Sequence, residues 1–342
     1  MPDYQDYLHN QLKLKHHPSG PLALDLFAGC GGLALGFEAA GFRTAGFESD
    51  PDCCETYSRN LHGTCKQLVL RVGQNLGVQP EVIIGGPPCQ PFSVGGLQNG
   101  HNDQRDGFPA FLASVKRYSP KVVVFENVRG MLYRNYAYLQ AIIRNLKELG
   151  YIVEYKLLNA VRYGVPQNRE RLFVIAHRGG WRLPRAASLG KPFTAGDALG
   201  ELAYQIPSNA RFVKPSMDVY IAKYERASKC INPRDLHLHR PSRTVTCRNL
   251  CGATGDMLRL RLPDGRRRML TVREGALLQS FPDWFQFAGN EDSQFNQIGN
   301  AVPPLLAKAV AESVMECLKS KELSRKQIIR RNEEGTQLHL SI

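Results

Sequence analysis

The stretch around which the chain is organised is Gly85-Gly86-Pro87-Pro88-Cys89-Gln90-Pro91-Phe92-Ser93. It follows the apolar run 81–84, a pattern typical of a buried parallel strand that ends at a pair of glycines. Glycines let the backbone turn sharply beside a ligand, and the three prolines make the loop rigid. Because open α/β sheets bind ligands at the carboxyl ends of their strands, we interpret Cys89 as a nucleophile rather than as a buried structural cysteine.

Strands and helices alternate on both sides of this loop. A strand at 22–27, a glycine-rich turn at 28–32, a helix at 33–40 and a strand at 44–47 lead to Glu48, in the dinucleotide-type βαβ order. This alternation predicts an α/β fold, with a mostly parallel sheet and helices on both faces. Further strands are expected at 82–85, 121–125, 151–158 and 171–176, and further helices at 108–118, 136–149, 271–280 and 301–319.

Composition points to a polyanionic partner. The 342 residues include 44 Lys and Arg against 31 Asp and Glu, a formal charge of +13, which favours nucleic acid over a membrane surface. The sequence has no apolar run long enough to span a bilayer. The sequence has nine cysteines, and its N-terminus shows no secretory pattern. These two features together indicate free thiols in a reducing compartment.

A zinc site is the one metal hypothesis that the sequence offers. His237, His239, Cys247 and Cys251 carry the right ligand atoms. The two cysteines have three residues between them, however, and no second closely spaced pair accompanies them, so we expect no metal.

The alternating pattern breaks after residue 178. Residues 179–268 hold 17 Lys and Arg against seven Asp and Glu, and apolar alternation on both sides of residues 263–265 predicts a hairpin. We expect a small, partly β domain there that supplies most of the charge facing nucleic acid, the alternative being a solvated face. The three arginines that follow the hairpin turn, Arg266, Arg267 and Arg268, are candidate phosphate contacts.

The loop at 85–93 resembles the catalytic loop of the cytosine-5 DNA methyltransferases. Four further motifs follow that family's order, so that the resemblance runs from about residue 22 to residue 318. We therefore identify the chain as a member of this family, of the prokaryotic restriction–modification type. The four motifs are Asp25–Gly32 (DLFAGCGG), Glu126–Val128 (ENV), Gln167–Arg171 (QNRER) and Gln297–Val302 (QIGNAV).

The resemblance implies methyl transfer to C5 of cytosine, which is too weak a nucleophile to react unaided. A thiolate that adds to C6 makes C5 reactive, and Cys89 suits this step. Glu126 ends a strand expected to run parallel to the one before Cys89, so a protonated Glu126 can donate to N3 of the base. The alternative is a solvated strand-end acid.

Arg169 and Arg171 complete the expected catalytic set. They lie two residues apart in an extended segment, so their side chains point the same way. In the family the matching arginines hold the base's O2 and organise the catalytic loop. The alternative is a surface salt-bridge cluster with Glu170.

The resemblance also implies S-adenosyl-L-methionine as methyl donor, with S-adenosyl-L-homocysteine as product, on a Rossmann-like core. Phe27 and the following turn would approach the donor, and Glu48 would take its ribose hydroxyls. Ser49 stands where the family usually has an aromatic residue, and Gln67 is our substitute for an Asp that usually contacts the adenine amino group; a backbone carbonyl is the alternative. A nicotinamide enzyme could share this plan, but nothing downstream supplies hydride chemistry. The expected cofactor residues are Asp25, Phe27, Ala28, Gly29, Gly31, Gly32, Glu48, Ser49, Gln67, Pro88, Asn300 and Val302.

A target base inside duplex DNA must be flipped out of the stack. The glycine-rich segment 94–100 is expected to close on it, with Gln98 or a neighbour entering the vacated space. Thr244 matches a family position that contacts the backbone near the flipped nucleotide, or is a plain β-branched strand residue. The expected DNA contacts are Ser93, Gln98, Arg243, Thr244, Arg266, Arg267 and Arg268.

In the family the last long helix returns to the large domain, which implies a discontinuous division. We expect a loose or peripheral N-terminal arm (1–20), a large cofactor-binding domain (21–178 with 293–342) and a small target-recognition domain (179–292). The setting implied is a prokaryotic cytoplasm, near the nucleoid, with double-stranded DNA and a cognate restriction endonuclease as partners, no membrane, and a monomer. The alternatives are a tRNA cytosine-5 methyltransferase of the same family and a catalytically silent DNA-binding homologue.

Overall fold

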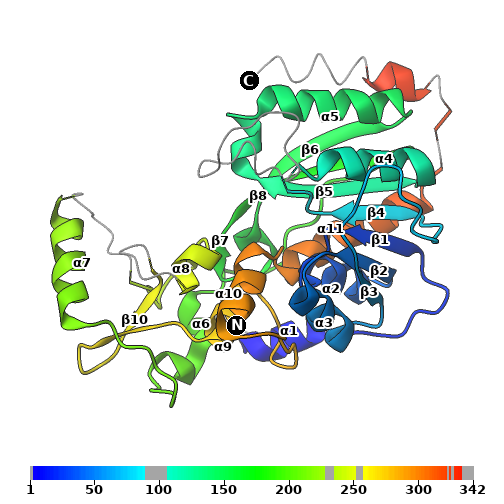
Figure 1. Cartoon of the computed structure of the whole chain (residues 1–342). Helices are drawn as coiled ribbons and strands as arrows, with labels where there is room; N and C mark the ends of the chain where they lie inside the picture. The colour runs from blue at the N-terminus through cyan, green and yellow to red at the C-terminus, as the bar shows by residue number, and fades with distance from the viewer. Residues whose placement is uncertain are drawn as a thin grey trace.

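A seven-stranded sheet forms the centre of the structure, which is a computed structural model (Figure 1). It describes residues 3–88, 106–227, 235–251, 257–321, 323–324 and 327–332. Cys89, Ser93, Gln98 and the glycine-rich segment 94–100 therefore lie outside the described residues.

The strand order of the sheet is β3-β2-β1-β4-β5-β8-β6. Adjacent strands from β3 to β5 are parallel, as the sequence predicted, but β8 is antiparallel to both β5 and β6. The start of β8 consequently lies at the same edge of the sheet as the ends of β4 and β5. The strands are β1 (Leu22–Leu26), β2 (Arg43–Glu48), β3 (Thr64–Gln67), β4 (Val82–Gly85), β5 (Val122–Val128), β6 (Ile152–Asn159) and β8 (Glu170–His177).

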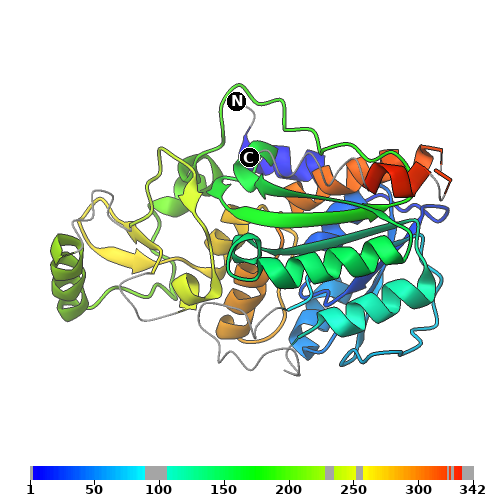
Figure 2. The ribbon, with the colours of Figure 1, turned by 90° about the horizontal axis from the view of Figure 1, so that it is seen from above.

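Helices cover both faces of the sheet, which confirms the predicted layers (Figures 1 and 2). Side chains alternate along each strand, so Ile83 packs with α4 and α5 while Ile84 packs with α2 and α11. The α2 and α11 backbones approach closely at Gly36, where a Cβ would lie 2.4 Å from the Lys308 amide nitrogen. Helix α11, the last long helix of the chain, therefore packs in the same layer as α2, on one face of the sheet. These helices are α2 (Gly32–Ala39), α3 (Pro51–Asn60) beside β2 and β3, α4 (Phe108–Tyr118), α5 (Tyr136–Glu148) and α11 (Pro304–Lys319).

Part of the N-terminal segment, for which we expected a loose or peripheral arm, is docked on the rest of the protein. Residues Tyr4–Gln11 form helix α1, and the Asp3 carboxylate caps its first turn. Tyr4 and Leu8, four residues apart, lie on one face and are buried, and the Tyr4 ring packs edge-on against Phe193 at 4.8 Å. A short amphipathic pattern within a polar segment was sufficient to dock it.

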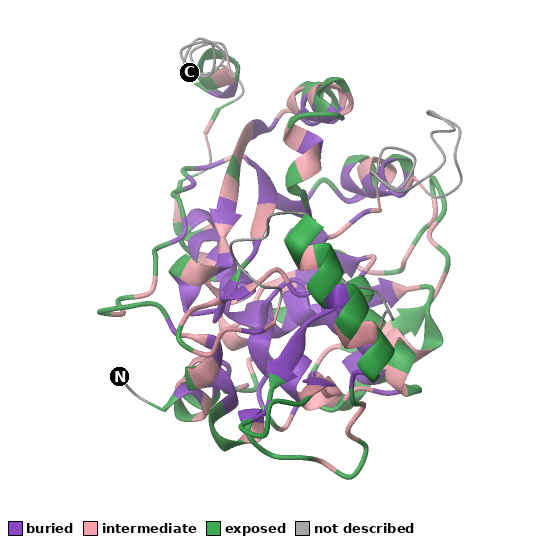
Figure 3. Ribbon diagram, turned by 90° about the vertical axis from the view of Figure 1, so that its left-hand side faces the viewer, coloured by how far each residue is buried: buried purple, intermediate pink, exposed green. Residues whose placement is uncertain are grey.

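Residues 179–268 are more helical than their sequence suggested. The predicted hairpin is present, since β10 (Arg259–Arg261) pairs antiparallel with β11 (Arg267–Met269). Helix α7 (Pro215–Ala227) is largely exposed (Figure 3). It was missed because most of its apolar side chains, Tyr220 among them, face solvent. The other short elements are η3 (Arg129–Leu132), η4 (Ala160–Tyr163), β7 (Gln167–Asn168), α6 (Ala195–Leu199), η5 (Gly200–Ala203), β9 (Ser242–Arg243), α8 (Cys247–Cys251), α9 (Val272–Leu278) and α10 (Glu291–Asn300).

Candidate active site

A cavity of about 950 Å³ opens at the carboxyl edge of the parallel strands. It is lined by the turn after β1, the end of β2, the start of the 85–93 loop, the ends of β5 and α10 and the start of β8. Three of the four expected catalytic residues meet there, namely Glu126, Arg169 and Arg171. Ten of the expected cofactor residues also line it: Asp25, Phe27, Ala28, Gly29, Gly32, Glu48, Ser49, Pro88, Asn300 and Val302.

The glycine turn after β1 helps to orient the side chain of Glu48 at the end of β2. Gly31 has φ 87°, and a Cβ there would lie 2.9 Å from the Tyr57 ring, so only glycine fits. The Gly29 amide donates to Glu48 Oε2 at 2.9 Å, and the Ser49 and Asp50 amides donate to Glu48 Oε1 at 2.7 and 3.0 Å. Three backbone amides therefore orient the Glu48 carboxylate before any ligand binds.

Asp25 is a buried acid that lines the same cavity. Its side chain is buried, and neither carboxylate oxygen has a hydrogen-bond partner among the described residues. Burial first, and then the nearby charge of Glu48, raise the pKa of this carboxyl well above its usual range. A buried carboxyl without partners costs stability. Together with Glu48, it fits a ligand that brings hydrogen-bond donors or positive charge, as the implied cofactor does.

Glu126 is not a solvated acid, because it is buried at the end of β5. Its Oε1 accepts from Arg171 Nε at 2.9 Å. Burial raises the pKa of the Glu126 carboxyl, while the charges of Arg171 and then Arg169 oppose part of that rise. A Cβ at Gly86 would lie 3.6 Å from Glu126 Oε2, so the carboxyl group stands beside the backbone that leads to Cys89.

Asn127 is a site residue that sequence reasoning did not single out. Its Nδ2 donates to the Pro87 carbonyl at 3.0 Å and ties the end of β5 to the start of the loop that carries Cys89. The signal was its central position in the Glu126–Val128 motif.

Arg169 joins three separate segments of the chain. Its guanidinium donates to the carbonyls of Val245, Gly299 and Ala301 at 2.6, 3.1 and 2.9 Å. The side chain is buried, and burial first, then the charge of Arg171, lower its pKa. These contacts exclude a surface cluster with Glu170, which pairs instead with Arg129 at 2.7 Å.

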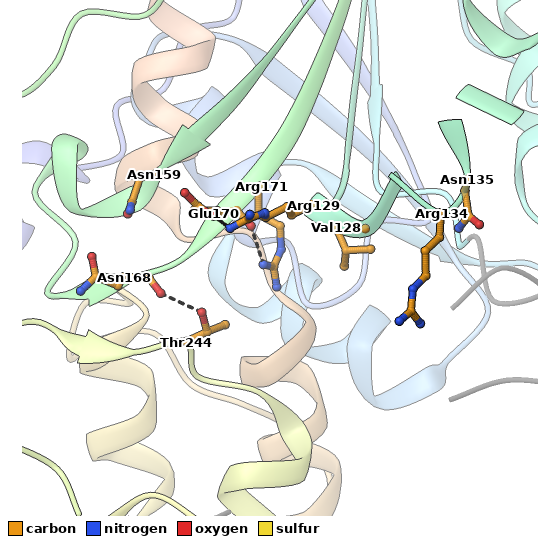
Figure 4. Close-up of a pocket in the computed structure, with 10 residues that line it drawn as sticks. Val128, Arg129, Arg134, Asn135, Asn159, Asn168, Glu170, Arg171 and Thr244 are labelled. Carbon is orange, nitrogen blue, oxygen red and sulfur yellow. Dashed lines mark hydrogen bonds and ion pairs between the residues drawn. The ribbon is translucent and has the colours of Figure 1, made fainter. Parts of the chain in front are cut away.

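Thr244 and Arg243 lie where the small domain meets the sheet. Arg243 pairs with Asn168 in the short parallel ladder of β7 and β9. The Thr244 hydroxyl donates to the Asn168 carbonyl at 2.7 Å (Figure 4). Thr244 lines a second cavity, next to the first.

The expectation for the three arginines after the hairpin turn needs correction. Arg268 is fully buried and holds both oxygens of Glu274, at 2.7 and 2.9 Å. Arg267 pairs with Asp235 and Asp218, both at 2.7 Å. Arg266 alone is exposed, and it pairs with Asp264. Two of the three cations therefore serve internal ion pairs, since acids from distant segments meet them in the fold.

Gln67 lies outside the main cavity, and the described residues offer neither a metal cluster nor a membrane-spanning helix. Gln67 pairs with Glu48 across β3 and β2 and donates to the Ser49 carbonyl at 3.4 Å, but it is not among the lining residues. Within the described ranges, no three His, Cys, Asp or Glu side chains are grouped so as to hold a metal ion. No helix in that part of the chain is long and apolar enough to cross a membrane.

Comparison with known proteins assigns the family. Residues 23–316 match the model of the C-5 cytosine-specific DNA methylase family, and the chain belongs to that family. It is 60% identical to Type II methyltransferase M.AplI of Arthrospira platensis, over 93% of this chain and 92% of that protein. It is 32% identical to Type II methyltransferase M.XorII of Xanthomonas oryzae pv. oryzae, over 88% and 86% of the two chains.

The fold also matches solved structures. A Spodoptera frugiperda DNMT2 mutant superposes with a TM-score of 0.70 at 18% identity, over 86% of this chain and all of that one. A putative DNA modification methyltransferase from an E. coli prophage gives a TM-score of 0.66 at 22% identity, over 88% of this chain and all of that one. The predicted family, fold class and enzyme class are thus confirmed: the protein is a DNA methyltransferase of the type II restriction–modification kind.

Proposed function

We propose that the protein methylates C5 of a cytosine flipped out of duplex DNA, with S-adenosyl-L-methionine as donor and Cys89 as nucleophile. The main support is the position of Glu126. It is a buried acid with a raised pKa, it stands against the backbone that leads to Cys89, and it shares a cavity with Asp25 and Glu48.

The residues for the donor are those of the glycine turn and the late motif. Glu48, already oriented by three amides, is placed to accept from ribose hydroxyls, and Asp25 offers two unpaired carboxylate oxygens. Phe27, Asn300 and Val302 line the same space. When bound, S-adenosyl-L-methionine supplies the methyl group.

Glu126 serves as the acid for the base. When the Cys89 thiolate forms its bond to C6, an electron pair moves toward N3 and O2, and a proton from Glu126 on N3 stabilises it. C5 then carries the electron pair that takes the methyl group. A base then takes the C5 proton, the electron pair of that C–H bond expels the thiolate, and N3 returns its proton to Glu126, which restores the ring. Arg171 positions the Glu126 carboxyl through its 2.9 Å contact.

Residues 179–292 are assigned to target recognition, and residues 21–178 with 293–342 to chemistry and cofactor binding. Arg169 supports the union of the two segments of the large part, because this residue of the first segment bonds to Gly299 and Ala301 of the second. It also links the large part to Val245 of the small one. A cognate endonuclease that cuts the same site fits the type II setting of the relatives.

Bisulfite sequencing of DNA from a host that expresses the protein tests this function. We expect cytosines within one short recurring sequence to resist conversion, and none to do so with Cys89→Ala. A host whose DNA converts fully while its tRNA gains 5-methylcytosine would show that the substrate is RNA.

A further inference from the structure

A second cavity, of about 680 Å³, adjoins the active-site cavity and shares Val128 and Arg171 with it (Figure 4). It is built from η3, which follows β5, and from the ends of β6 and β7. The two cavities therefore follow one edge of the sheet. A DNA strand whose target base sits at Glu126 has room for a neighbouring phosphate in the adjoining cavity.

The charges of the second cavity are almost completely paired. It is lined by three arginines and one acid, Glu170. Arg171 pairs with Glu126, and Arg129 pairs with Glu170 at 2.7 Å while stacking over the Tyr133 ring. Arg134 is exposed, and its side chain makes no hydrogen bond or ion pair with any described residue. The guanidinium of Arg134 is therefore the one arginine charge of this cavity that no acid among the described residues pairs with.

Apart from Glu170, the lining of the second cavity holds no acid that would repel an anion. Asn159 and Asn168 line the opposite side of the cavity from Arg134, where the Thr244 hydroxyl already donates to the Asn168 carbonyl. Figure 4 shows the Arg134 side chain extending away from its own backbone. An exposed guanidinium in a cavity whose one acid is already paired suits a phosphate contact that carries no base information.

We propose that Arg134 binds a backbone phosphate of the DNA strand that carries the target base, within this second cavity. Arg129 acts beside it by neutralising Glu170, which would otherwise repel the strand. This inference rests on the proposed function, since it takes duplex DNA as the substrate. It adds a positioning contact from η3 and the segment after it, outside the small domain to which the sequence had assigned most of the DNA-facing charge.

The test is the salt dependence of binding to a mixed-sequence DNA duplex. Each phosphate contact contributes about 0.9 to the slope of log K against log salt concentration, so Arg134→Gln should reduce that slope by about 0.9. The loss should be equal for any duplex sequence, and Arg134→Lys should restore most of the slope. A merely structural role would not change the slope by one charge.

Arg144 provides the matched control. It is an exposed arginine on α5 that does not line the second cavity, and its side chain has no hydrogen bond or ion pair among the described residues. Arg144→Gln should leave the slope unchanged. A wild-type slope in Arg134→Gln, or equal losses in both variants, would overturn the proposal. A wild-type protein without salt-dependent binding to duplex DNA would instead overturn the proposed function.

Discussion

Two regions of the molecule bury arginines beside acids, with different results. At the sheet edge, Arg171 pairs with Glu126, and both face a cavity of about 950 Å³. Behind the hairpin, Arg268 pairs with Glu274, and both side chains are enclosed by protein. The first pair leaves an acid with a raised pKa where a substrate can reach it, and the second pair only holds elements together. The number of cations in a segment therefore does not say which of them meet DNA.

The largest effect should come from breaking the enclosed pair. Arg268→Ala leaves Glu274 buried without its partner, and such a loss costs about 3–5 kcal/mol of the free energy of unfolding. Urea unfolding followed by circular dichroism would measure it, with the exposed Arg266→Ala as control, whose midpoint should change little. A stable Arg268→Ala protein whose DNA binding loses about 0.9 of its salt slope would make Arg268 a phosphate contact after all.

The cavity-facing pair should behave in the opposite way. Glu126→Gln keeps the shape of the side chain but removes the proton that we assign to N3, so methylation should slow by ~10²-fold or more. Single-turnover rates would show the loss, while DNA affinity and the unfolding midpoint stay near wild type. Unchanged rates would reduce Glu126 to a structural acid like Glu274.

Asp25 provides a pH test of the same cavity. Its pKa is raised in the folded protein, so the folded state keeps a proton that the unfolded chain releases near pH ~3.9. Stability from this group is present below that pH and is lost as pH rises through the folded pKa. Asp25→Asn should therefore raise the thermal midpoint of the ligand-free protein at alkaline pH, have little effect at acid pH, and weaken binding of S-adenosyl-L-homocysteine. If the two proteins share one pH profile, Asp25 has a partner in solution.

Gln67 should give the smallest effect. It touches the site only through the Ser49 carbonyl, at 3.4 Å, and a bond of that length contributes about 1 kcal/mol at most. Calorimetric titration with S-adenosyl-L-homocysteine should show that Gln67→Ala binds a few-fold more weakly. A loss of a hundredfold or more would place Gln67 in direct contact with the ligand.

The sequence predicted best where structure depends on local pattern. The predicted bounds of β4 and α4 agree with the structure, because glycines and apolar periodicity mark them. The direction of β8 was not predicted, because the apolar pattern of a strand is the same whether it runs parallel or antiparallel to its neighbours. The antiparallel direction is what brings Arg171 to Glu126. The partners of Arg268 also escaped prediction, because a buried ion pair depends on packing between distant segments.

The central claim is that Cys89 attacks a cytosine held at Glu126. Fluorine at C5 cannot leave as a proton, so a duplex whose cytosines are replaced by 5-fluorocytosine should trap the Cys89–C6 adduct. We expect a band of reduced mobility on a denaturing gel that requires S-adenosyl-L-methionine and is absent for Cys89→Ala. A band that persists in Cys89→Ala, or a wild-type protein that never forms one, would contradict the account.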